Sequence, residues 1–335
     1  NLSVEGSILN KHQALDSEWM EGVVSPDVTG GSARLVFEKN GISLKAEYVL
    51  RSADVSVYNK YNEASANALL VEGSYTSGNL GANLTFRKIS NLGFQSDYNE
   101  GTMFTCLNYI PALTQQHQYS LASLNPYQSQ MDGETGGQAD VYYFFDRRTF
   151  MGGPRGMRAH ANFSTYYGPS PYVDIRKNEL YFRDLTFDVE RWWGRHIKAI
   201  FQYTWQTSNN RVSVHPVYEF RNSHIAVANV TYKVNNTHAI RAEYQHLWCN
   251  KGDGNWCAGT LEYTISPGWS FSVSDMWNYG LTRIHYYNGS LSYSWSRTRI
   301  AANFGRFREG YQCAGGVCRL IPAYTGANLS LTTSF

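Results

Sequence analysis

The sequence lacks the features of several protein classes. None of its apolar stretches reaches about 18 residues, so a transmembrane helix is excluded. Its 29 basic and 27 acidic residues give a formal charge of only +2, which provides no basis for nucleic-acid binding. The opening stretch, NLSVEGSIL, has neither the basic start nor the apolar core of a signal peptide. We therefore expect either a mature, exported chain or a cytosolic one.

Cysteine is also scarce, but its arrangement is informative. Of the five cysteines, Cys249 and Cys257 flank the stretch NKGDGNW, and Cys313 and Cys318 flank AGGV. This spacing predicts two disulfides, Cys249–Cys257 and Cys313–Cys318, each across one glycine-rich loop in an oxidising compartment. A metal site is the weaker alternative, because no pair of histidines lies close by. Cys106 remains, and we expect it to be a buried free thiol.

Aromatic residues and alternating strands are what the sequence has in abundance. Aromatic residues make up 15% of the chain, with 25 Tyr and 9 Trp. In GTLEYTI, the residues Leu261, Tyr263 and Ile265 share one face of an extended strand, and Glu262 lies on the other with two threonines. The last stretch, ANLSLTTSF, alternates in the same way and ends on Phe335. A period of two recurs along the chain, and no helical period survives over a comparable length.

Two details distinguish these strands from those of a soluble sandwich. Charged residues stand in the middle of the polar face, as Arg241 and Glu243 do, and tryptophans such as Trp248 and Trp295 lie at strand ends, where a membrane interface selects them. Short turns also alternate with long loops. We therefore predict an all-β fold: a transmembrane antiparallel β-barrel of about 14–16 strands, with short periplasmic turns and long extracellular loops, formed by residues 1–335 as one domain.

The polar face supplies the candidate functional residues. Lys198, Arg241, Glu243, Glu262 and Arg299 are predicted to line the lumen of the barrel. Two interpretations remain open. These charges either neutralise one another across neighbouring strands, or they create a transverse field that orients small polar solutes in a channel.

A search for catalytic residues gives no convincing set. His160 and Ser164 lie on the same polar face, but four strand residues separate them by about 13 Å, too far for a nucleophile and its base. The glycine-rich stretch MGGPRGM, Met151 to Met157, predicts a tight turn and not a phosphate-binding helix start. No arrangement of metal ligands stands out, and no cofactor is predicted. We therefore expect a protein that is not an enzyme.

Several segments carry a family resemblance, among them NYIPALTQQHQYSLA, GNWCAGTLEYTISPGWSFSVSDMWNYG and REGYQCAGGVCRLIPAYTGANLSLTTSF. Over most of its length the chain resembles a Bacteroidota family of outer-membrane β-barrel proteins known only as a domain of unknown function. The resemblance implies the outer membrane of such a bacterium and assigns no catalytic residue. Members of that family carry a further β-rich region upstream, so we expect this chain to lack an N-terminal part.

These observations predict a porin-like channel for small polar solutes in the bacterial outer membrane. The alternative is a non-conducting barrel that anchors or braces a larger envelope complex. The expected partners are outer-membrane lipid and, for the alternative, other outer-membrane proteins or lipoproteins, with no nucleic acid.

Overall fold

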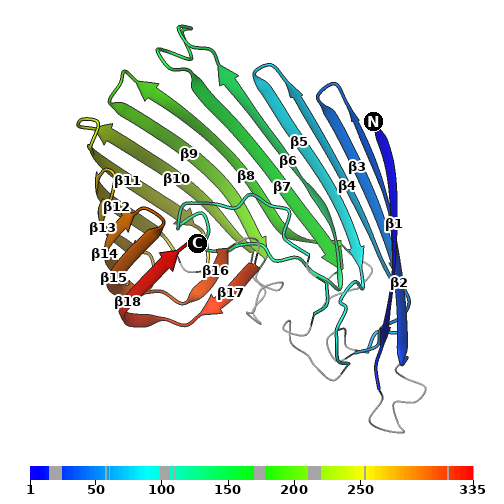
Figure 1. Ribbon diagram of the computed structural model, residues 1–335. Helices are drawn as coiled ribbons and strands as arrows, with labels where there is room; N and C mark the ends of the chain where they lie inside the picture. The colour runs from blue at the N-terminus through cyan, green and yellow to red at the C-terminus, as the bar shows by residue number, and fades with distance from the viewer. Residues whose placement is uncertain are drawn as a thin grey trace. The chain divides into compact units, whose positions relative to one another are not determined.

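The computed structural model describes most of the chain: residues 1–14, 25–56, 59, 61–98, 106–108, 110–169, 178–209, 220–252, 254–314 and 317–334. The terminal Phe335 lies outside the described residues. Within these ranges every regular element is a β-strand (Figure 1). No helix of the described residues is long and apolar enough to cross a membrane.

Sixteen strands form one sheet, and their order follows the chain from β1 to β15 and then β18. The remaining two, β16 and β17, form a separate hairpin. The strands are β1 (Leu2–His12), β2 (Asp27–Lys39), β3 (Ile42–Arg51), β4 (Ala66–Ser77), β5 (Leu80–Ser90), β6 (Gly133–Phe145), β7 (Met157–Pro169), β8 (Asn178–Trp193), β9 (Ile197–Asn209), β10 (Phe220–Lys233), β11 (His238–Cys249), β12 (Trp256–Ile265), β13 (Trp269–Asn278), β14 (His285–Trp295), β15 (Thr298–Phe307), β16 (Gly310–Ala314), β17 (Val317–Ile321) and β18 (Tyr324–Thr333).

The predicted all-β antiparallel fold with 14–16 strands is confirmed. Consecutive antiparallel neighbours are the strand order of an up-and-down β-barrel. Many strands exceed the length of about nine to eleven residues that a bilayer-spanning strand requires, and β8 reaches 16.

Short and long connections alternate along the sheet, as predicted. Six connections of two to four residues join β2–β3, β4–β5, β8–β9, β10–β11, β12–β13 and β14–β15. In the first of these, Asn40 and Gly41 both have positive φ, the conformation that closes a two-residue hairpin with the right twist. The exception is the β6–β7 connection, residues 146–156, which contains the predicted tight turn but is longer than a turn.

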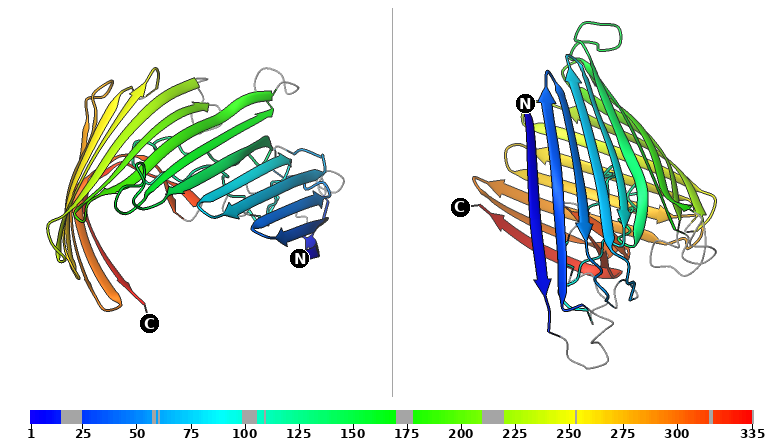
Figure 2. Two further views of the ribbon diagram at one scale, coloured as in Figure 1. Left: turned by 90° about the horizontal axis from the view of Figure 1, so that it is seen from above. Right: turned by 90° about the vertical axis from the view of Figure 1, so that its right-hand side faces the viewer.

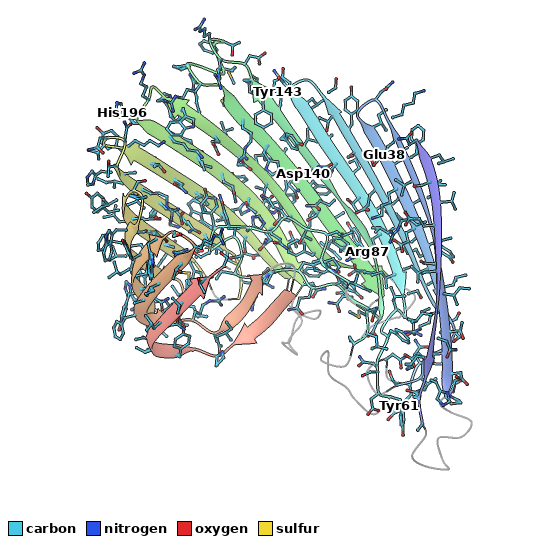
Figure 3. The ribbon with its side chains drawn as sticks, in the orientation of Figure 1. Glu38, Tyr61, Arg87, Asp140, Tyr143 and His196 are labelled. Carbon is cyan, nitrogen blue, oxygen red and sulfur yellow. The ribbon has the colours of Figure 1, made fainter. Side chains whose placement is uncertain are left out.

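The chain divides into two compact units. The first unit comprises Asn1–Thr114, Tyr127–Val141 and Phe163–Arg183, and the second comprises Gln115–Pro126, Tyr142–Asn162 and Asp184–Phe335. In the first unit the strands β1 to β5 lie side by side (Figure 2). Glu38 lies next to the short β2–β3 turn, whereas Tyr61 lies in the long β3–β4 connection at the other end of the strands (Figure 3).

The strand register gives the sheet two different faces. In β12 and β13 of the second unit, Leu261 is opposite Val273, and both belong to the apolar face. They are 52% and 59% exposed, and similar exposure recurs at apolar residues of this face along the whole sheet. An apolar surface this extensive is rare on soluble monomers, where it marks a membrane or protein contact.

Candidate functional site

Three of the predicted lumen residues come together on the polar face of the second unit. Arg241 of β11 donates from Nη1 to Glu243 at 2.8 Å and from Nε to Glu262 of β12 at 3.0 Å. The register explains the cross-strand contact, because Arg241 and Glu262 are direct partners in the ladder. One guanidinium therefore bridges two carboxylates, and one negative charge of this group is left without a cation of its own.

The two other predicted lumen residues lie elsewhere on the same face. Lys198 of β9 forms an ion pair of 2.8 Å with Glu190 of β8. Arg299 of β15 donates to the hydroxyl of Ser292 at 3.3 Å. The structure does not bring either of them to the Arg241 group. Their role in lining a lumen stays a prediction.

The same pairing of charges occurs in the first unit. Arg34 of β2 lies between Glu5 of β1, at 3.0 Å, and Glu47 of β3, at 2.9 Å. Lys45 pairs with Glu72 of β4 at 2.7 Å. These side chains are partly exposed, so water screens each pair and its contribution to stability is small. Opposite charges thus pair across strands in both units, but Arg34, like Arg241, is shared by two carboxylates.

A segment that sequence reasoning missed covers part of the polar face in the second unit. Residues Gln115–Pro126, within the long β5–β6 connection, cross this face of the strands (Figure 1). Four of its side chains are buried against an apolar patch of β10, β11 and β12. The cluster comprises Tyr119, Leu121, Ala122 and Leu124 of the segment and Ile225, Val227, Leu247, Trp256 and Ala258 of the strands.

Polar contacts anchor this inner segment, Gln115–Pro126, at its middle. The amide oxygen of Gln245 accepts a hydrogen bond of 2.9 Å from the backbone N–H of Leu121, and its amide nitrogen donates to Ser120 at 3.3 Å. Arg221 of β10 donates to Asn125 at 3.0 Å. The segment is therefore held by apolar burial and by bonds to strand side chains.

A histidine and an aspartate fix the start of the inner segment. His117 Nε2 lies 2.8 Å from a carboxylate oxygen of Asp184 in β8, and both side chains are almost fully buried. The same carboxylate accepts from Thr186 at 3.0 Å and from Gln206 at 3.0 Å. Asp184 therefore has partners on both oxygens, and it ties the inner segment to β8 and β9.

A second buried group lies in the first unit. Arg87 of β5 donates to Glu134 of β6, and the other oxygen of Glu134 accepts from the hydroxyl of Tyr127 at 2.5 Å. The Tyr127 ring stacks on Tyr166 and Phe182 with centroids 4.8 and 5.3 Å away. Figure 3 shows Arg87 near the end of β5 that leads into the long connection.

Burial changes the acidity of groups in the long connection. It raises the pKa of Tyr127 well above the usual value, and the adjacent Glu134 charge adds to this shift. Burial also raises the pKa of Tyr119 in the inner segment and that of the Cys106 thiol. Cys106 is a free thiol, as expected, although it is half-buried and not fully buried.

The predicted disulfide between Cys249 and Cys257 is wrong. Both are free thiols. Cys257 pairs with His246 in the ladder, and His246 precedes Cys249 by three residues. Cys257 is therefore about 10 Å from Cys249 along the strand direction and lies on the opposite face of the sheet. That separation exceeds the reach of a disulfide. Cys313 and Cys318 are direct ladder partners in the β16–β17 hairpin, and their link stays a prediction.

A cavity of about 380 Å³ opens beside the inner segment in the second unit. Its walls include Tyr119 and Ser120 of the segment, Arg241 and Glu243 of β11, and residues of β12 to β15. Among the described residues, no group of three or more His, Cys, Asp or Glu side chains is placed to hold a metal ion.

These features define a class of protein: an all-β protein with a sequential sixteen-stranded antiparallel sheet, one exposed apolar face and one ion-paired polar face. Within it, the chain belongs to the Family of unknown function (DUF6029), whose model matches residues 1–335. No curated protein matches the chain.

Solved structures with some similarity include mutants of the porin of Rhodopseudomonas blastica. A mutant with two basic residues changed to alanine shares 11% identity at a TM-score of 0.38, and one with an alanine changed to tryptophan shares 10% at 0.38. A triple mutant of the same porin shares 12% at 0.36. Each alignment covers 91% of this chain and 94% of the porin chain. TM-scores this low do not establish a common function.

Proposed function

We propose that this protein is a β-barrel of the bacterial outer membrane that lets small polar solutes pass along its polar face. The observation that carries the proposal is the contrast between the two faces of the sheet. One face exposes large apolar side chains along its length, which suits contact with lipid. The other carries paired charges and a polar cavity, which suits contact with water and solutes.

Closure of the sheet is part of this proposal. An open sheet would leave strand edges with unpaired backbone groups, which a bilayer does not tolerate. Pairing of β1 with β18 would remove both edges, and a closed barrel of sixteen strands is wide enough for an aqueous lumen. In keeping with the family resemblance, we assign the barrel to a Bacteroidota outer membrane. In this proposal the barrel acts as a channel and not as an enzyme.

Single-channel conductance of the purified protein in planar bilayers tests the proposal. A channel gives discrete, reproducible current steps whose size grows with salt concentration. The matched control is the same preparation heated until the sheet unfolds, which must give none. Absence of steps from folded protein would overturn the channel function.

One observation favours the second candidate, a non-conducting barrel that braces an envelope complex. The β6–β7 connection is longer than the other connections at its end of the sheet, and Phe150 within it is 94% exposed. Arg147, Arg148 and Arg155 belong to the same connection. An exposed aromatic side chain among arginines is typical of a protein contact. Co-purification with defined envelope proteins that is lost on Phe150→Ala, together with zero conductance, would establish this function.

A further inference from the structure

The cavity beside the inner segment is lined by both arginines and carboxylates. Its arginines and carboxylates come from the second unit alone, from β11 to β15 and the residue that follows β15. A charged side chain that is already paired within the protein is less available to a ligand. The pairing of these side chains therefore decides which ligand the cavity can accept.

The two carboxylates of the cavity differ in how fully they are paired. Glu243 accepts from Arg241 at 2.8 Å, from Gln245 at 2.6 Å and from Asn229 at 3.4 Å. Asp275 lies 2.7 Å from a ring nitrogen of His285. Glu243 is therefore engaged on both oxygens, whereas Oδ1 of Asp275 has no hydrogen-bond partner among the described residues.

Two arginines at the cavity are held differently. The guanidinium carbon of Arg306 lies 5.6 Å from the ring centre of Tyr286, and that of Arg308 lies 5.9 Å from the ring centre of Trp256. Within the described parts of the chain, Arg306 makes no ion pair. A guanidinium that lies over an aromatic ring still presents the N–H groups at its edge, and that fork matches a carboxylate.

Part of the otherwise polar lining can contact an apolar ligand body. Tyr119, Met276 and Ala258 are among the lining residues, and the volume of about 380 Å³ is in the range of sites for small organic molecules. Sulfur and aromatic side chains make favourable contacts with a ligand ring.

We propose that this cavity binds a small organic carboxylate with an aromatic body, its carboxylate at the Arg306 guanidinium and its ring between Tyr119 and Met276. The inference names the solute class of the proposed channel and rests on that function for passage of the solute, but not for its binding.

Equilibrium binding of benzoate to the full chain in detergent tests the proposal, with isothermal titration calorimetry as the readout. Benzamide, which has the ring without the charge, and acetate, which has the charge without the ring, are the comparison ligands. We expect benzoate to bind at least about tenfold more tightly than either, because both the ion pair and the ring contact contribute.

Arg306→Gln should weaken benzoate binding about tenfold, and Arg306→Lys should weaken it less, because lysine keeps the charge but loses the fork. The matched control is Arg297→Gln, which removes the same charge from the short turn at the other end of β15 and should leave binding unchanged. Heat-modifiable migration in gels confirms that each variant is folded.

Equal benzoate affinities in Arg306→Gln and Arg297→Gln, or benzamide binding as tight as benzoate, would overturn the proposal. The conductance test is separate. If the protein binds benzoate but carries no current, the channel function is rejected and the binding site is supported. If it conducts but does not bind benzoate, the binding site is rejected and the channel function stands.

Discussion

Arg87 and Glu134 form a buried ion pair between β5 and β6, with their side chains 6% and 0% exposed. Glu134 accepts from Arg87 Nε at 3.0 Å, from the Tyr127 hydroxyl at 2.5 Å and from the backbone N–H of Gln130 at 2.7 Å. Because both of its oxygens are used, the carboxylate ties the end of the long connection to the strands of the first unit.

Removing one partner of this pair should be costly. Glu134→Ala leaves the Arg87 charge buried without compensation, and we expect a loss of about 3–5 kcal/mol in the free energy of unfolding. Glu72→Ala is the matched control, because its pair with Lys45 is 36–38% exposed and should be worth at most about 1 kcal/mol. Urea unfolding in lipid vesicles measures both, and equal losses would contradict the role assigned to Glu134.

The raised pKa of Tyr127 predicts that the folded protein loses stability at alkaline pH. Its pKa is raised in the folded protein, so folding favours the protonated phenol. The stabilisation is fully present below the unfolded pKa of about 10 and is lost as the pH rises towards the folded value.

The stability difference between the native protein and Tyr127→Phe measures this effect. We expect a difference of about 1 kcal/mol at pH 8, from the hydrogen bond to Glu134, and a smaller one at about pH 11. Other tyrosines titrate in both proteins, and their effects cancel in the difference. A difference that stays constant between these two pH values would rule out the linkage.

The apolar face makes a prediction about lipid contact. Leu261 lies in the middle of β12, whereas the hydroxyl of Tyr263 lies 2.6 Å from a ring nitrogen of His238, near the strand end. Leu261→Arg should therefore cost about 2–4 kcal/mol on folding into a bilayer, and the neighbouring Glu262→Gln, on the polar face, should cost much less. Folding titrations in vesicles test this, and similar costs would refute the assignment of the faces.

Alternation in the sequence was sufficient to predict these two faces. Leu261 and Glu262 are on the sides expected for them, because a period of two depends only on the geometry of an extended chain. Sheet order was predictable for the same reason, since short turns force neighbouring strands to pair. Exact strand ends were not, because polar and apolar residues continue to alternate beyond the expected ends.

The inner segment was not predictable from alternation. In β10 the four residues Ile225 to Ala228 are all apolar, so both faces of the strand are apolar at this point. This pattern indicates that another part of the chain covers the face that is polar elsewhere in the sheet. Nothing in that pattern says that the cover is Tyr119–Leu124, which lies far earlier in the chain. Partners this distant follow from tertiary packing and not from local spacing.

The cysteines give a prediction about thiol chemistry. Spacing alone suggested two links, but the register separates Cys249 from Cys257 and brings Cys313 opposite Cys318. We expect the isolated protein to contain one disulfide, Cys313–Cys318, with the three other cysteines as free thiols. Thiol counting and non-reducing peptide mapping test this. A Cys249–Cys257 peptide would show that the register at the end of β11 is wrong.

The final prediction concerns the ion-paired group around Arg241. Changing Glu243 and Glu262 to Lys replaces two attractions with two repulsions at partly buried positions and places three cations on one stretch of the polar face. In an open channel, the altered field should shift ion selectivity towards anions, measured as the reversal potential in a salt gradient.

Changing Glu63 and Glu309 to Lys is the control, because it makes the same change in net charge at exposed connections. A selectivity shift of equal size in both double variants would mean that total charge, and not the polar face, sets the field. In a non-conducting brace, native protein carries no current and the Glu243, Glu262 variant only loses stability, because like charges replace satisfied ones in a partly desolvated interior. The reversal potential and the unfolding free energy together therefore separate the two functions.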